Sequence, residues 1–264
     1  MKRTIPFLVV IVLATATMAR AAEPAAAAPL KGMDAYRNRQ TAWRPKLEDR
    51  LMLGTRLTPA VLLRPTSSDG FLGTIVKLNL QEDFVPWKLF AAYQFTPRWG
   101  VELTWDQVVA DAVTRASDQH IDGDFELTGP ILSAVYRLEK RGRFQPYGQV
   151  GFGWMKGNFD PARWWELGYD KESDWIMLGS PREPRNSITR DIRVDDAPAV
   201  VAAAGSRIEI ARHWSGDVFL RGMYLETESQ FTEMRKGKPI KGVGEVSSIP
   251  FSNVALGLGV AYTF

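Results

Sequence analysis

The last eleven residues of the chain alternate strictly between large and small side chains. Large apolar groups occupy every second position and small residues fill the others: Val254, Leu256, Leu258, Val260, Tyr262 and Phe264 alternate with Ala255, Gly257, Gly259, Ala261 and Thr263. A period of two predicts a β-strand. In a soluble β-sandwich the second face would carry solvated Lys, Glu, Thr or Ser side chains. A small second face favours a narrow barrel in lipid, because bulky groups face the acyl chains and little room remains inside.

The same alternation recurs in seven earlier segments, at residues 51–58, 88–95, 101–106, 131–138, 149–154, 200–210 and 218–224. With the terminal segment they make eight strands, an even number and the smallest common size for outer-membrane barrels. We therefore predict an all-β fold over residues 49–264, an eight-stranded antiparallel up-and-down transmembrane β-barrel. A soluble lipocalin-like barrel is a weaker alternative.

The connections between these segments alternate in length. Tight polar turns lie at 96–99, 140–143 and 213–216, and long polar segments lie at 64–85, 112–124, 156–197 and 227–250. Outer-membrane barrels have short periplasmic turns and long outer loops. Both chain ends are then expected in the periplasm. Residues 74–80 also alternate, and either extend the second strand or form a hairpin above the membrane.

The first 21 residues have the pattern of a signal peptide. Lys2 and Arg3 precede the apolar run Ile5–Ala14, and Ala19-Arg20-Ala21 supplies small residues where a signal peptidase cuts. The run is too short to span a bilayer as a helix, which disfavours an uncleaved inner-membrane anchor. We predict cleavage after Ala21 or Ala22, export to the cell outer membrane, and a flexible periplasmic lead-in over residues 22–48.

Composition excludes several classes of site. The chain has no cysteine, so thiolate metal sites, thiol catalysis and disulfides are excluded. It has only two histidines, His120 and His213, too few for a multi-histidine metal site. A net charge of +3, from 33 basic and 30 acidic residues, gives no reason to expect nucleic acid. We predict no metal, no cofactor and no catalytic site.

One enzyme hypothesis needs a test. His213-Trp214-Ser215 with Glu226 resembles the arrangement of outer-membrane lipid A deacylases, in which a base and a carboxylate activate a hydroxyl nucleophile. His213 and Ser215 lie in a predicted periplasmic turn, however, and Glu226 lies one strand-length away. A lipid A-modifying enzyme is therefore the minor alternative.

Three stretches carry a resemblance to a known family. They are KLFAAYQFTPRWGVELTWDQ, LTGPILSAVYRLEKRGRFQPYGQVGFGW and the terminal GLGVAYTF, about 100 residues in all, and they resemble the outer-membrane protein W family. The resemblance implies an eight-stranded barrel with a narrow channel for small apolar molecules. Similar glycine–aromatic alternation occurs in outer-membrane protein A and its relatives. The chain departs from the family in its longer third outer loop and in its charged lumen faces.

Six charged residues fall on the small, inward faces of the strands: Arg56, Glu102, Asp106, Arg207, Glu209 and Arg221. Facing lipid near the midplane, such groups would cost about 2–4 kcal/mol each. We therefore place them in the lumen, as either a selectivity zone or a structural salt-bridge plug. The plug is favoured, because eight strands leave room for little but side chains.

The termini of the predicted barrel suggest partners. Tyr262 and Phe264 resemble the C-terminal signal that the barrel-assembly machinery reads. Outer-membrane lipid and lipopolysaccharide would surround the barrel. The third loop, with Trp164-Trp165 and the run Ser180–Ser187, either binds a partner or is a mobile, solvated loop, and the second is favoured.

Two functions remain: a narrow channel for small, apolar solutes, or a closed structural or adhesive barrel that acts through its outer loops.

Overall fold

The computed structural model describes residues 50–63, 66–67, 76–80, 87–113, 120–240 and 246–264. The predicted signal peptide (1–21) and lead-in (22–48) lie outside these residues. Among the described residues, no helix is long and apolar enough to cross a membrane.

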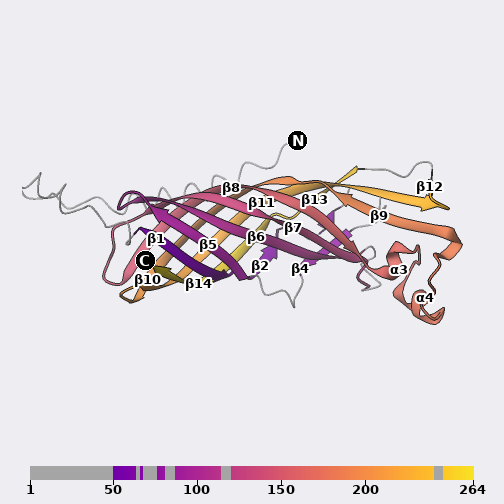
Figure 1. The fold of residues 1–264 in the computed structure, drawn as a ribbon, viewed down its shortest axis with the longest axis horizontal. Helices are drawn as coiled ribbons and strands as arrows, with labels where there is room; N and C mark the ends of the chain where they lie inside the picture. The colour runs from indigo at the N-terminus through magenta and orange to yellow at the C-terminus, as the bar shows by residue number, and fades with distance from the viewer. Residues whose placement is uncertain (1–49, 64–65, 68–75, 81–86, 114–119, 241–245) are drawn as a thin grey trace, which may run out of the picture.

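Eight strands form one closed antiparallel ring (Figure 1). They are β1 (Leu51–Leu57), β5 (Trp87–Gln94), β6 (Trp99–Val113), β7 (Gly123–Arg137), β8 (Phe144–Pro161), β10 (Ala197–Ala211), β11 (Trp214–Arg235) and β14 (Asn253–Thr263). Each pairs with the next in this order, and β14 pairs with β1 to close the ring. The predicted eight-stranded barrel is confirmed.

All three tight turns lie at one end of the barrel, together with the C-terminus (Figure 1). They join β5 to β6, β7 to β8 and β10 to β11. The long connections lie at the other end, as the alternating loop lengths predicted. We call the two ends the turn end and the outer end.

Residues 76–80 extend the wall of the barrel at the outer end. They form β4 (Val76–Leu80), which pairs with the short β3 (Thr66–Ser67) and with β6. On β6, β4 occupies positions 110–113, farther out than the positions 100–104 that pair with β5. Of the two alternatives for residues 76–80, the structure therefore favours the first: β4 extends the second strand of the barrel.

The outer connections contain more regular structure than the sequence predicted. β11 extends beyond the barrel and pairs there with β9 (Ile188–Val194), β12 (Lys238–Pro239) and β13 (Val246–Pro250), while β2 (Ala60–Leu62) pairs with β14. Two short helices, α3 (Arg163–Glu166) and α4 (Glu172–Met177), and a 3₁₀ turn (Arg185–Ser187) connect β8 to β9. Trp164 and Trp165 are both buried, and the Trp165 ring packs against the rings of Phe159 and Phe231. The aromatic side chains at the start of the third loop therefore form a core, whereas α4 has no buried residue. Whether the loop binds a partner or is mobile stays a prediction.

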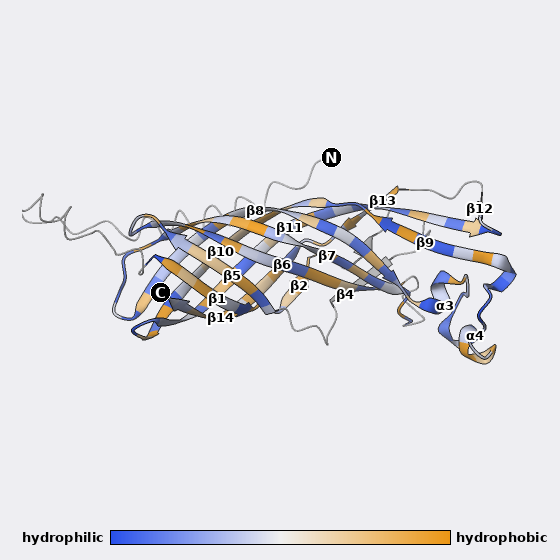
Figure 2. Ribbon diagram, in the orientation of Figure 1, coloured by the Kyte–Doolittle hydropathy of each residue, from blue (hydrophilic) through white to orange (hydrophobic). Residues whose placement is uncertain are grey.

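The outward face of the ring carries a belt of exposed apolar side chains. Exposed leucine, valine and aromatic residues alternate along the strands with small or polar ones, and the colour of the strands in Figure 2 changes repeatedly between hydrophobic and hydrophilic. Phe144 and Trp154 bracket a part of β8, and Trp214 and Tyr224 bracket a part of β11. Each bracketed part has the roughly 9–11 residues with which a tilted strand crosses the hydrocarbon core, and aromatic girdles mark both interfaces of such barrels.

The belt ends where the outward residues of β11 become polar. Past Tyr224, the outward positions are Glu226, Glu228 and Gln230, all exposed. The strand continues beyond this point in the same alternation, so its outer part stands in water rather than in lipid. The outer extension of β7, β8, β9 and β11 therefore projects above the membrane.

The interior of the ring is divided into two zones. Toward the outer end it is apolar and contains fully buried residues such as Phe125, Leu127, Met155, Leu225 and Phe251. Toward the turn end it contains buried charged side chains. The sequence placed the charged residues in the lower to middle depth of the lumen, but it gave no indication of the apolar zone toward the outer end.

Candidate functional site: an ion-pair network in the lumen

The centre of the charged zone is the Arg56 guanidinium, which reaches across the barrel from β1. Its Nε donates to Asp217 Oδ2 at 2.8 Å, its Nη2 donates to Glu102 Oε2 at 2.9 Å, and its Nη1 also binds Glu102. The guanidinium lies over the Phe90 ring, 4.0 Å from its centroid. Arg56 is 4% exposed and Glu102 is fully buried. Bidentate pairing of this kind compensates best for taking two charges out of water.

Two further groups complete this first cluster. Arg207 Nη2 lies 3.3 Å from Glu102 Oε2, and the Tyr147 hydroxyl donates to Asp217 Oδ1 at 2.9 Å. Strand register explains the meeting of these groups, since Gly259 stands between Arg56 and Asp217 on the intervening strand. A Cβ at Gly259 would lie 2.8 Å from Arg56 Cγ, so the absent side chain makes room for the pair.

A second cluster lies beside the first. The carboxylate of Asp106 on β6 accepts from Lys88 Nζ on β5 and from Arg221 Nη1 on β11, one oxygen to each. All three side chains are buried. The two clusters together connect β1, β5, β6, β10 and β11, strands from opposite sides of the ring.

Little space remains among these groups. Arg56, Lys88, Asp106, Phe219 and Arg221 all border a cavity of about 10 Å³. That is close to the minimum of roughly 10–15 Å³ that one water molecule needs. At this depth the side chains fill the barrel.

Five of the six charged residues singled out from the sequence meet in these clusters: Arg56, Glu102, Asp106, Arg207 and Arg221. Glu209 does not join them. Its carboxylate pairs with Lys140 at the rim of the turn end, and its side chain is 46% exposed. The two-residue period placed Glu209 on the inward face, but it could not show that the position lies beyond the lumen.

Three members of the network were not predicted from the sequence: Lys88, Asp217 and Tyr147. Lys88 was on an inward face but was not singled out. Asp217 and Tyr147 lie one and two positions before the segments 218–224 and 149–154, and continuing the alternation backward would have placed both inside the barrel.

The C-terminal aromatics lie at the turn end. The Tyr262 ring stacks on His213 with centroids 5.5 Å apart and packs edge-on against Phe264 at 5.1 Å. Phe264 is 46% exposed. Their reading by the assembly machinery stays a prediction.

The candidate lipid A deacylase residues lie apart. His213 Nδ1 contacts the Thr263 carbonyl oxygen at 2.9 Å, and Glu226 accepts from Tyr224 and Ser248. Ser215 and Glu226 lie on the same strand, roughly 35 Å apart at ~3.3 Å per residue. These residues cannot form the hydrogen-bonded relay that such chemistry requires.

Comparison with known proteins supports the fold. No family model matches the chain, and no curated protein matches it. Among solved structures, OprG from Pseudomonas aeruginosa is 16% identical with a TM-score of 0.58, over 81% of this chain and 96% of that one. The outer membrane protein AlkL is 16% identical with a TM-score of 0.53, over 91% and 97%. E. coli outer membrane protein W is 18% identical with a TM-score of 0.45, over 82% and 99%.

The first two similarities agree with the closed ring of strands. The expected resemblance to small outer-membrane barrels is confirmed at the level of the fold. The fold and the outward apolar belt together place the barrel in an outer membrane. The chain thus has the architecture of the small eight-stranded outer-membrane β-barrels.

Proposed function

We propose that the barrel admits small apolar solutes into the outer half of its interior, and that the ion-pair network closes the axial route toward the periplasm. The observation that carries this proposal is the division of the interior into an apolar outer zone and a charged zone at the turn end. Transfer of an apolar molecule from water into the first zone is favourable. The buried charges of the second zone disfavour its passage.

The apolar zone can adapt to a guest. Met155 and Met223 lie within it, fully buried. Methionine side chains are unbranched and flexible, so they rearrange around irregular shapes at low cost. A small solute would enter by displacing such side chains rather than by filling an existing void.

Binding of a fluorinated benzene to the barrel in bilayers, followed by ¹⁹F NMR, tests this proposal. We expect saturable binding that weakens several-fold in Leu225→Asn. The change replaces a fully buried leucine with a polar amide side chain of nearly the same size. Ile176→Asn, on the exposed helix α4, is the matched control and should bind as the unmodified protein does. Absence of saturable binding, or equal binding by Leu225→Asn, would overturn the proposal.

The alternative is a closed structural or adhesive barrel. The folded outer extension favours it, since α4 presents Ile176, Met177 and Leu178 exposed at its tip. Loss of cell-surface attachment on replacing these three residues with serine, without saturable binding of the apolar probe, would favour this alternative. In either case the surrounding partners are outer-membrane lipid and lipopolysaccharide, with the barrel-assembly machinery acting during biogenesis.

A further inference from the structure

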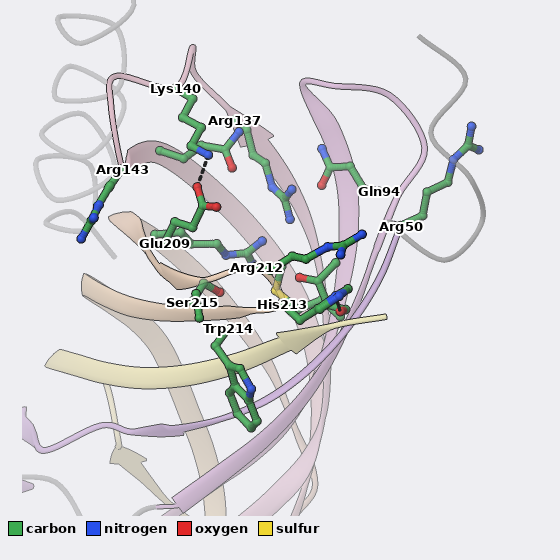
Figure 3. A pocket seen from close by; sticks show the side chains of 15 residues that line it. Arg50, Gln94, Arg137, Lys140, Arg143, Glu209, Arg212, His213, Trp214 and Ser215 are labelled. Carbon is green, nitrogen blue, oxygen red and sulfur yellow. Dashed lines mark hydrogen bonds and ion pairs between the residues drawn. The ribbon is translucent and has the colours of Figure 1, made fainter. Parts of the chain in front are cut away.

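The lumen opens at the turn end into a mouth of about 220 Å³ (Figure 3). Arg137 from β7 and Arg212 from the β10–β11 turn lie on its inner side, while Arg50 and Arg143 lie at its margins. The mouth is bounded below by Arg207 of the first ion-pair cluster. It is separate from the apolar zone to which the proposed function refers.

The charges around this mouth are unbalanced. Six basic side chains border it: Arg50, Arg137, Lys140, Arg143, Arg207 and Arg212. Glu209 is the one carboxylate bordering it among the described residues, and it is held by Lys140. In the part of the chain that the structure describes, Arg137 and Arg212 have no carboxylate partner. Lining of a single sign raises the local concentration of the opposite ion.

Buried donors at the base of the mouth provide a second, independent observation. Arg207 is 4% exposed, yet its Nε and Nη1 have no hydrogen-bond partner among the described residues. Arg137 Nε is also buried without a partner there. A buried donor without an acceptor is costly, so native proteins supply a partner from protein, water or ligand. Arg137 and Arg207 both border the mouth, so an acceptor bound there would lie beside these donors.

Phosphate chemistry fits these donors. The planar fork of a guanidinium matches phosphate oxygens, and a tetrahedral phosphate offers acceptors in several directions to arginines from different strands. The volume lies below the roughly 300 Å³ of sites for drug-sized ligands, so the occupant is compact. We infer that the mouth binds a phosphate group presented from the periplasm, as free phosphate or as an anionic lipid headgroup.

A titration of the refolded barrel with inorganic phosphate, followed by ³¹P NMR and calorimetry, tests the inference. We expect saturable binding in excess of chloride at matched ionic strength. Each charge-assisted hydrogen bond contributes about tenfold or more in affinity, so Arg137→Gln/Arg212→Gln should bind at least tenfold more weakly. Arg212→Gln alone is the second variant, since its exposed turn position does not threaten folding. Arg98→Gln is the matched control, because Arg98 lies in another turn at the same end, outside the mouth.

A second arm separates the two sources of phosphate. The barrel is placed in vesicles of phosphatidylcholine with and without phosphatidylglycerol, and its melting temperature is compared for the same variants. Stabilisation by phosphatidylglycerol that Arg212→Gln removes and Arg98→Gln retains would support a lipid headgroup. Binding of free phosphate with the same dependence would support a soluble anion. If neither arm responds, or if Arg98→Gln lowers binding as much as Arg212→Gln, the inference is wrong.

Discussion

At the scale of single residues, the stability of the barrel depends on charged side chains that are buried in its lumen. Glu102 and Asp106 are completely buried, and each accepts from two basic side chains. Removing one partner of a buried pair leaves an uncompensated charge, which costs more than the pair itself contributed. Exposed ion pairs of the outer extension, such as Arg185–Asp174 at 3.1 Å, contribute about 0–1 kcal/mol.

Arg221→Ala or Glu102→Ala should therefore destabilise the barrel far more than Arg185→Ala. We expect a loss of about 3–5 kcal/mol for the first two, less where water enters the lumen. Thermal unfolding in bilayers, read by the heat-dependent gel shift, measures the difference. Equal melting temperatures for the three variants would show that the buried groups are not mutually compensating.

A second residue-scale prediction concerns Gly257, which faces inward on β14. A Cβ at this position would lie 2.0–2.5 Å from three ring atoms of Phe219, and the buried ring packs beside the Arg56 guanidinium. Gly257→Ala should cost about 1–3 kcal/mol by overpacking. Gly216→Ala is the control, because its nearest contact would be at 3.5 Å. A melting temperature of Gly257→Ala equal to that of Gly216→Ala would contradict the packing described.

At the scale of the strand, each element has a lipid face and a lumen face. On β14, Leu256 and Leu258 are 58% and 54% exposed, while Ala255 and Ala261 are buried. The outward positions near the middle of the strand lie in the hydrocarbon, and those near the turn end lie at the interface.

Arginine at Leu256 or Leu258 should impair folding into bilayers by about 2–4 kcal/mol, as for a basic residue near the midplane. The same change at Leu53, which pairs with Tyr262 at the turn end, should cost about 0–1 kcal/mol. Denaturant titration of the barrel in vesicles measures the three values. If Leu256→Arg and Leu258→Arg fold as well as Leu53→Arg, these leucines do not face lipid.

The strands were not equally predictable from the sequence. Eight barrel strands were predictable, because the contrast between a lipid face and a crowded lumen imposes a strict local period. β9, β12 and the outer part of β11 were not, since outward Glu226 and Glu228 stand in water and the apolar contrast disappears. The sequence predicted that basic and acidic side chains face the lumen together. It did not predict which of them form ion pairs. Partners such as Arg56 and Asp217 lie 161 positions apart along the chain, and strand register brings them together.

At the scale of the whole molecule, orientation follows from the alternation of connections. We therefore expect the turn end to face the periplasm and the extension with α3 and α4 to face the outside. The exposed connection around Arg182 and Arg185 follows α4 and precedes β9.

Trypsin applied to intact cells should therefore cut within residues 157–197, first at Arg182 or Arg185. The turn Lys140–Arg143 should be spared until the outer membrane is permeabilised, although its residues are exposed on the barrel itself. Mass spectrometry of the fragments gives the cleavage sites. Cleavage at 140–143 in intact cells would reverse the orientation.

The central claim is that the ion-pair network closes the lumen, and planar-bilayer conductance tests it most directly. We predict that the unmodified barrel passes no sustained ion current. Glu102→Ala and Arg221→Ala should produce discrete openings, since each removes a side chain from the filled cross-section, whereas Arg185→Ala should behave as the unmodified protein does. A steady conductance in the unmodified barrel that neither Glu102→Ala nor Arg221→Ala enlarges would contradict the claim.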